Sequence, residues 1–194
     1  MSEPEAALAP PARVLEARAR AELIVSAERV QFAIDQTAVR LAARLTHANP
    51  VLLCVMQGGL MYAGELARRL QFPLQLGYVH VGRYRDATSG GVLDWIAKPN
   101  VDIAGRHVLL VDDILDQGVT LNGLLRWLGG QGASAITTTV LVNKEVQRAE
   151  RVAVDFAAVS CPDRFLIGCG MDYQGYWRNL PAIYALPRDM EDPH

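Results

Sequence analysis

The sequence predicts an α/β fold in which a parallel sheet core is flanked by helices. Strand-like apolar runs alternate with amphipathic helical stripes, which is the pattern of a parallel sheet covered on both faces. The runs are continuously apolar, as expected for strands buried on two sides. A carboxylate-rich stretch follows one of them, and ligands of such sheets bind at the carboxyl ends of the strands. The 194 residues are enough for one domain with a full core.

The first half of the chain predicts two helices and two strands. Ser26 is a suitable N-cap for a helix whose buried face is Val30, Ile34, Ala38, Leu41 and Leu45. Pro50 to Met56 ("PVLLCVM") is a buried strand that ends before Gly58 and Gly59. A second helix is marked by Leu60, Ala63, Leu66 and Leu70. Pro73 to Val81 is the second strand.

A polar, glycine-rich segment from Gly82 to Gly91 then predicts a mobile flap between short strands. "HVLLVD" is the third buried strand, and the helix after it is marked by Leu121, Leu124, Leu125 and Leu128. Ala135 to Val142 is the fourth strand. The last fifty residues have no comparable helical stripe, so we expect short strands and loops that form a small lobe over the sheet edge.

Composition limits the classes of function. The formal net charge is −2 and about half of the residues are hydrophobic, which argues against disorder and against a basic nucleic-acid surface. No apolar run reaches the roughly 18 residues of a membrane span. Residues 1 to about 12 are expected to be a flexible tail rather than a secretion signal. The three cysteines fit reduced structural thiols, and the expected location is the cytoplasm.

The stretch "VLLVDDILDQGVTL", Val108 to Leu121, carries the chemistry. It places Asp112, Asp113 and Asp116 at the end of a buried strand and closes on a turn into a helix. Gly118 permits a tight backbone, and free amides at the start of the helix suit a phosphate, to which Thr120 adds a hydroxyl. The carboxylates need other partners, such as sugar hydroxyls or magnesium. A sugar phosphate satisfies both requirements.

A receiver domain also begins with "LLVDD", but it does so at its N-terminus, whereas about a hundred residues precede the motif here. The stretch resembles instead the phosphoribosyl-diphosphate-binding motif of type I phosphoribosyltransferases, and the resemblance extends from about Leu23 to Leu186. It implies that fold, with residues 13–194 as a single domain whose small hood lobe comes mainly from about 150–194 and N-terminal elements. The aspartate at position 116 is typical of the hypoxanthine-guanine branch.

The resemblance implies a role for each motif residue. The leaving pyrophosphate would be bound by Gln57 and Gly58, after a non-proline cis peptide between Met56 and Gln57, and by Arg178. The ribose and its phosphate would be bound by Asp112, Asp113, Asp116, Gln117, Gly118, Val119 and Thr120. The purine would be bound by Lys144, Phe165 and Leu166, and magnesium by Asp172 with Asp112 and Asp113. Asp116 would be the catalytic residue, and Arg83 and Tyr84 lie in the flap.

The implied activity is magnesium-dependent transfer of ribose 5-phosphate from phosphoribosyl diphosphate to hypoxanthine or guanine. No nucleic acid or membrane partner is expected, and the family habit implies a homodimer or homotetramer. Gln57 departs from the pattern because many relatives carry lysine there, which predicts modest affinity for the diphosphate. Two alternatives stay open: a regulator on the same fold that senses the diphosphate, and an enzyme that prefers xanthine.

Overall fold

The computed structural model describes residues 9–82, 93–148 and 152–191. Its centre is a six-stranded sheet in the order β4-β3-β2-β5-β6-β7. The strands are β2 (Val51–Met56), β3 (Gln75–Gly82), β4 (Asp94–Ala97), β5 (His107–Leu115), β6 (Ala135–Lys144) and β7 (Phe156–Cys161). All neighbouring strands are parallel except β3 and β4. The α/β fold with a parallel sheet core is therefore confirmed.

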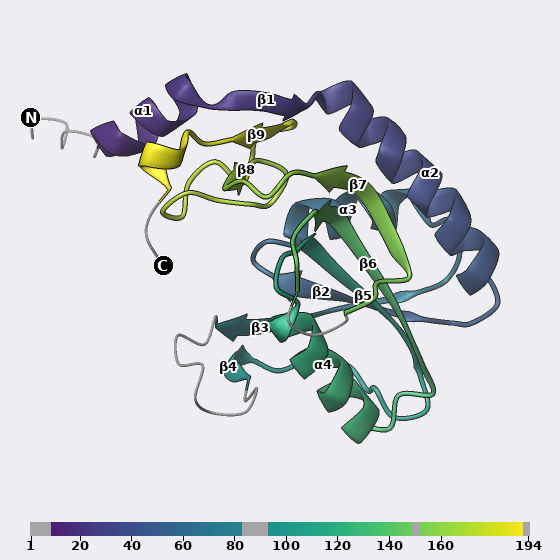
Figure 1. The fold of residues 1–194 in the computed structure, drawn as a ribbon. Coiled ribbons are helices and arrows are strands. Elements are labelled where there is room, and N and C mark those ends of the chain that lie inside the picture. Colours follow the sequence, from purple (N-terminus) through teal and green to yellow (C-terminus); the bar gives the residue numbers. More distant parts are fainter. Residues whose placement is uncertain (1–8, 83–92, 149–151, 192–194) are drawn as a thin grey trace, which may run out of the picture.

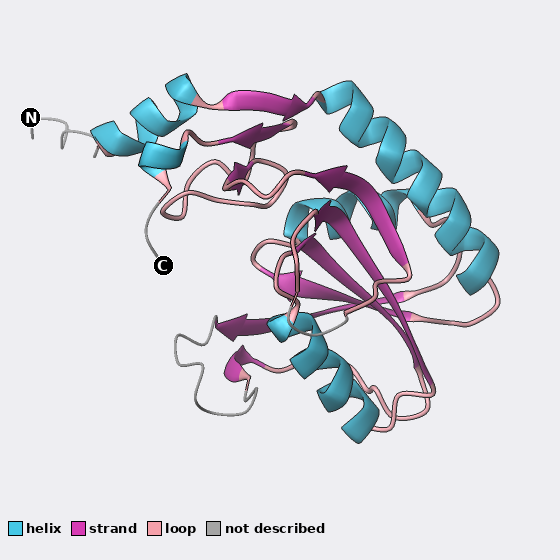
Figure 2. Ribbon diagram, in the orientation of Figure 1, coloured by secondary structure: helices cyan, strands magenta, loops and turns pink. Residues whose placement is uncertain are grey.

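Helices cover both faces of this sheet (Figure 2). α2 (Ala27–Leu45) and α3 (Leu60–Arg69) pack on one face, and α4 (Val119–Gly130) packs on the other. The α2 stripe is buried as predicted, and Ser26 Oγ accepts a hydrogen bond from the N–H of Arg29 as an N-cap. Within the described residues, no helix combines the length and the apolar character needed to cross a membrane.

A second, three-stranded sheet forms a small lobe (Figure 1). It contains β1 (Glu22–Val25), β9 (Ile183–Ala185) and β8 (Leu166–Ile167), in that order. α1 (Ala12–Arg20) and the short 3-10 helix η1 (Arg188–Met190) pack on it around a separate apolar cluster. The sequence did not predict α1 or β1, although Val14 and Ala17, both fully buried in this cluster, have helical spacing.

One strand was assigned to the wrong layer by the sequence. The segment that contains Phe156–Cys161 was expected in the small lobe, but it is β7, an edge strand of the large sheet, parallel to β6. Parallel strands are usually joined through a helix, and no helical stripe separates β6 from β7. The described residues of this connection, 145–148 and 152–155, contain no helix, so the alternation of strand and helix that predicted the other strands is missing here.

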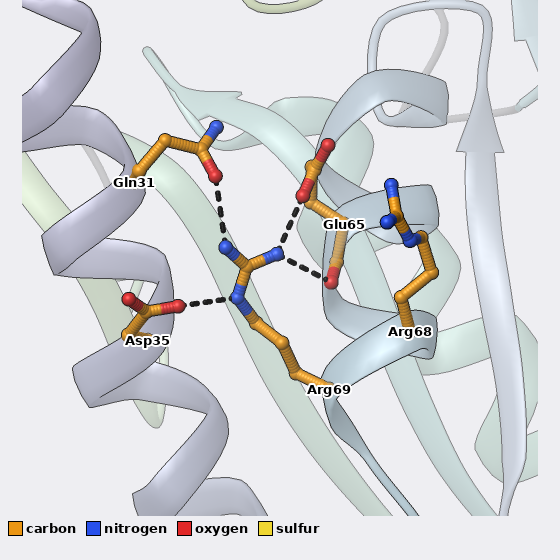
Figure 3. Close-up of a pocket in the computed structure, with 5 residues that line it drawn as sticks. All are labelled: Gln31, Asp35, Glu65, Arg68 and Arg69. Atoms are coloured by element: carbon orange, nitrogen blue, oxygen red, sulfur yellow. Dashed lines mark hydrogen bonds and ion pairs between the residues drawn. The ribbon is translucent and has the colours of Figure 1, made fainter.

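An arginine cluster ties α2 to α3 (Figure 3). Arg69 pairs with Asp35 on α2 and with Glu65 on its own helix, and it donates to the side chain of Gln31 at 2.8 Å. With Arg68 these residues line a surface pocket. Because the pocket lies toward the C-terminal end of α3, away from Gly58 at its start, and Arg69 is already paired with Asp35 and Glu65, we assign it a structural role.

Candidate functional site

The strand order fixes where a ligand should bind. The chain passes from β2 to β3 on one side of the sheet and then crosses to β5 on the other side of β2. β2 and β5 are therefore neighbours whose connections leave in opposite directions. In doubly wound sheets, ligands bind outside the carboxyl ends of such strands. Gln57 follows β2 and Asp116 follows β5, so two predicted site segments meet at this point.

The peptide bond between Met56 and Gln57 is cis, as the family resemblance predicted. The next residue, Gly58, lies against the Asp113 carboxyl group, which occupies the space that a Cβ atom would need. A Cβ atom at Gly59 would meet the carbonyl oxygens of Val55 at 2.7 Å and Val111 at 2.8 Å. Close packing between the end of β2 and the end of β5 therefore requires glycine at position 59, where the clash is with backbone, and favours it at position 58.

Two of the three acidic residues, Asp112 and Asp113, are inside β5 rather than after it. The predicted strand stopped at Asp112, whereas β5 continues to Leu115. Asp113 is buried, with 9% of its surface exposed, and its N–H donates to Asp112 Oδ1 at 2.9 Å. The extra length carries Asp116 to the first position beyond the strand, directly before the predicted phosphate loop.

The loop from Gln117 to Thr120 has the backbone of an anion-binding turn. Gly118 is the N-cap of α4 with φ of 80°, a left-handed conformation that favours glycine. No side chain caps the helix and no acid lies in its first turn, among the residues that the structure describes. Its first amides are therefore available to a phosphate and are favoured by the helix dipole.

Asp116 and Lys144 come together from adjacent strands. Lys144 Nζ lies 3.5 Å from Asp116 Oδ2 and 3.0 Å from Asp163 Oδ1. The lysine side chain is 11% exposed, whereas those of Asp116 and Asp163 are 42% and 63% exposed. The arrangement offers one cationic donor and a carboxylate acceptor side by side, facing solvent. The sequence did not predict the third member, Asp163.

The small lobe supplies a second cluster of charge. Arg178 donates to the Gly170 carbonyl at 2.6 Å and pairs with Asp172 Oδ1 at 2.7 Å. Asp172 Oδ2 also accepts from the N–H of Gly175 at 2.7 Å. Gly170, at φ of 110°, lies so close to the Gly58 carbonyl oxygen that no Cβ atom would fit. The loop with Arg178 therefore rests directly on the segment after β2.

α1 supports this loop from outside. Trp177 Nε1 donates to the Val14 carbonyl at 2.9 Å, and Arg13 Nε donates to the hydroxyl of Tyr173 at 2.8 Å. Tyr173 is fully buried in the cluster around α1. Both contacts are made by residues that follow Asp172 in this loop, so α1 restrains the loop that carries it.

Of the predicted base-binding residues, Lys144 ends β6 of the large sheet, whereas Phe165 and Leu166 lie in the small lobe. Phe165 is half-buried beside the α1 cluster, with its ring edge-on to Tyr173 at a centroid distance of 6.0 Å. Leu166 is buried in β8 and pairs with Ala185. The predicted flap residues Arg83 and Tyr84 lie outside the described residues.

Carboxylates for a hard cation lie on both sides of the site. Among the described residues no three metal-binding side chains converge. Asp172, paired with Arg178, and the acids of β5 supply oxygens but not a complete coordination sphere. Magnesium is usually held by one or two carboxylates together with substrate phosphates and water, and these residues fit that mode.

The three cysteine thiols should be unreactive in the folded protein. Burial, together with Asp112 and Asp113, raises the pKa of Cys54 to about 12. Burial raises the pKa of Cys169 to about 12, and burial and Glu145 raise that of Cys161 to about 11. Because the thiolate is the reactive form, we expect no rapid reaction with Ellman's reagent at pH 8. All three thiols should react in denaturant, and a fast native thiol would contradict this.

The comparisons with known proteins agree over most of the chain. A family model described as a phosphoribosyl transferase domain matches residues 24–174. The hypoxanthine-guanine phosphoribosyltransferase of Streptococcus pneumoniae is 31% identical, over 81% of this chain and 90% of that protein. The hypoxanthine-guanine-xanthine phosphoribosyltransferase of Tritrichomonas foetus is 34% identical, over 82% and 91%. The hypoxanthine phosphoribosyltransferase of Trypanosoma cruzi, solved with the product IMP, superposes with a TM-score of 0.80 at 29% identity, over 87% and 95%.

Proposed function

Because the chain belongs to the phosphoribosyltransferase family, we propose that it transfers ribose 5-phosphate from phosphoribosyl diphosphate to hypoxanthine or guanine. The products are IMP or GMP and pyrophosphate, which is a reaction of purine salvage. The observation that carries the proposal is the pairing of Asp116 with Lys144 beside an uncapped helix start. A proton acceptor and a cation suited to a 6-oxopurine lie next to a phosphate cradle.

In the proposed reaction the ring nitrogen of the purine attacks the anomeric carbon as the bond to pyrophosphate breaks. Positive charge develops on the sugar, so rate acceleration rests on charge stabilisation and positioning. Asp116 accepts or orients the proton on the attacking ring nitrogen, and Lys144 donates to the purine oxygen. Phe165 stacks on the base, and the Leu166 backbone meets its exocyclic edge.

The remaining residues bind the diphosphate. Asp112 and Asp113 accept from the ribose hydroxyls, and the amides of residues 117–120 hold the 5-phosphate. The amides at Gln57 and Gly58 and the Arg178 guanidinium bind the leaving pyrophosphate. Asp172 and the β5 acids would hold magnesium, which would neutralise charge on the diphosphate when bound.

The proposal is tested by a spectrophotometric assay with phosphoribosyl diphosphate and magnesium, with hypoxanthine, guanine, xanthine and adenine offered in parallel. We expect turnover of hypoxanthine and guanine and none of adenine. Xanthine is included because the T. foetus relative is named for it as well. Failure of all four bases, in a folded protein that still binds the diphosphate, would refute the proposal. Light scattering in the same buffers tests the expected dimer or tetramer.

Restoring a lysine at position 57 should strengthen diphosphate binding. Gln57 is exposed at the start of the proposed pyrophosphate loop, and a charged donor there adds roughly 1.5 kcal/mol. We expect Gln57→Lys to lower KM for the diphosphate by about tenfold with no change in KM for the base. Gln131→Lys adds the same charge at the exposed end of α4 and is the control. An unchanged KM in Gln57→Lys would mean that the side chain at position 57 does not reach the pyrophosphate.

A further inference from the structure

Arg148 connects the two strands that carry Asp116 and Lys144. It lies just beyond β6, in the connection to β7. Its guanidinium is half-buried, and its Nε and one terminal nitrogen lie within hydrogen-bonding distance of four oxygens from both strand ends. These are Asp116 O at 2.6 Å, Leu115 O at 2.9 Å, Lys144 O at 2.7 Å and Asn143 Oδ1 at 2.9 Å. No sequence motif marked this residue.

The four contacts begin where the sheet ladder stops. The last paired position of β5 and β6 is Leu115 with Asn143. The next residues along the chain are Asp116 and Lys144. Arg148 donates hydrogen bonds to both of their carbonyls, and so links the two strand ends beyond the last paired residues of the sheet. An arginine suits this position because its planar guanidinium holds two donor nitrogens in a rigid fork. Nε bonds to Asp116 O, and the oxygens of Leu115, Asn143 and Lys144 share the two hydrogens of one terminal nitrogen. A lysine ammonium cannot span the same set of oxygens.

The direct contact between the two side chains is too weak to hold them. Asp116 Oδ2 and Lys144 Nζ are 3.5 Å apart, beyond the usual length of a charged hydrogen bond. Asp163 also holds Lys144 Nζ, at 3.0 Å, but the separation of the two strand ends is set by their backbones, and Arg148 binds both backbones. We propose that Arg148 is a positioning residue that fixes the proton acceptor relative to the base-binding lysine. The inference rests on the proposed function and deepens it.

Three variants test this role in the standard assay: Arg148→Ala, Arg148→Lys and Arg126→Ala. Arg126 is exposed on α4, so its variant removes the same charge away from the site. We expect kcat of Arg148→Ala to fall by about 10- to 100-fold, the effect of displacing catalytic groups by around an ångström. Guanidinium chloride, below denaturing concentrations, should restore part of kcat where equal sodium chloride does not. Arg148→Lys should stay low, and Arg126→Ala should match the wild type.

Two results would overturn the inference. One is a kcat for Arg148→Ala within twofold of the wild type. The other is a loss of kcat that equals the fraction of unfolded protein in the sample and is not reversed by guanidinium chloride. If the wild-type chain turns over no base, the proposed function is refuted without testing Arg148. Hydrogen exchange of backbone amides then tests whether Arg148 holds the two strand ends in place. Amides of residues 117–121 should exchange faster in Arg148→Ala, with α2 unchanged. Equal exchange in both proteins would again overturn the inference.

Discussion

Replacing Asp116 with asparagine is expected to lower kcat by about 10²- to 10⁴-fold, the usual contribution of a positioned proton acceptor. Asparagine keeps the size of the side chain but cannot accept the proton of the attacking purine. The side chain is 42% exposed, so the free energy of unfolding should change by less than about 1 kcal/mol. Steady-state kinetics and urea unfolding of the same preparation measure the two quantities.

The chain contains a matched control for this experiment. Asp163 contacts the same lysine, at 3.0 Å, but comes from the connection between β7 and β8 rather than from the end of β5. Asp163→Asn makes the same chemical change beside the same cation. We expect it to alter kcat by only a few fold. Equal losses in both variants would mean that the effect comes from Lys144, and an unchanged kcat in Asp116→Asn would exclude Asp116 as the acceptor.

The parts of the fold that the sequence predicted are those with a local signal. α2 has a regular apolar stripe and a serine cap, and β2 is a continuous apolar run before two glycines. β7 has neither signal, because its strand is only half-buried and no apolar helical stripe separates it from β6 in the sequence. α1 is short, and its burial depends on a lobe built largely from the other end of the chain.

In the candidate site, too, the residues that the sequence predicted are those with a local signal. Motif residues such as Asp116 and the cis bond before Gln57 lie in short stretches that are recognisable without a structure. Arg148 and Asp163 have no motif, because their importance comes from contacts with residues about 20 to 30 positions away. Periodicity predicts which face of an element is buried, but it does not predict which polar side chains meet across strand ends.

Gly170 illustrates how the two lobes depend on each other. Its φ of 110° is strained for any other residue. A Cβ atom there would meet the Gly58 carbonyl oxygen, which is backbone and cannot swing aside. Arg178 also binds the Gly170 carbonyl, so displacement of Gly170 would move the proposed pyrophosphate-binding arginine. One substitution should therefore disturb both stability and diphosphate binding.

We expect Gly170→Ala to lower the free energy of unfolding by roughly 2 to 5 kcal/mol, the sum of backbone strain and overpacking. Gly175→Ala separates the two causes. Gly175 lies in the same loop at φ of 84°, with open space where a Cβ atom would be. Its variant should lose only about 1 to 2 kcal/mol. Urea midpoints at constant m-value measure both losses.

The two glycine variants should also differ in their kinetics. If contact between Gly170 and Gly58 holds the pyrophosphate loop, folded Gly170→Ala should show a raised KM for the diphosphate, while Gly175→Ala keeps the wild-type value. Because the clash is with backbone at the end of β2, the KM for the base should change less in both variants. Equal stability losses and unchanged diphosphate KM values would mean that Gly170 is needed only for its φ, and that the small lobe does not set the shape of the loop after β2.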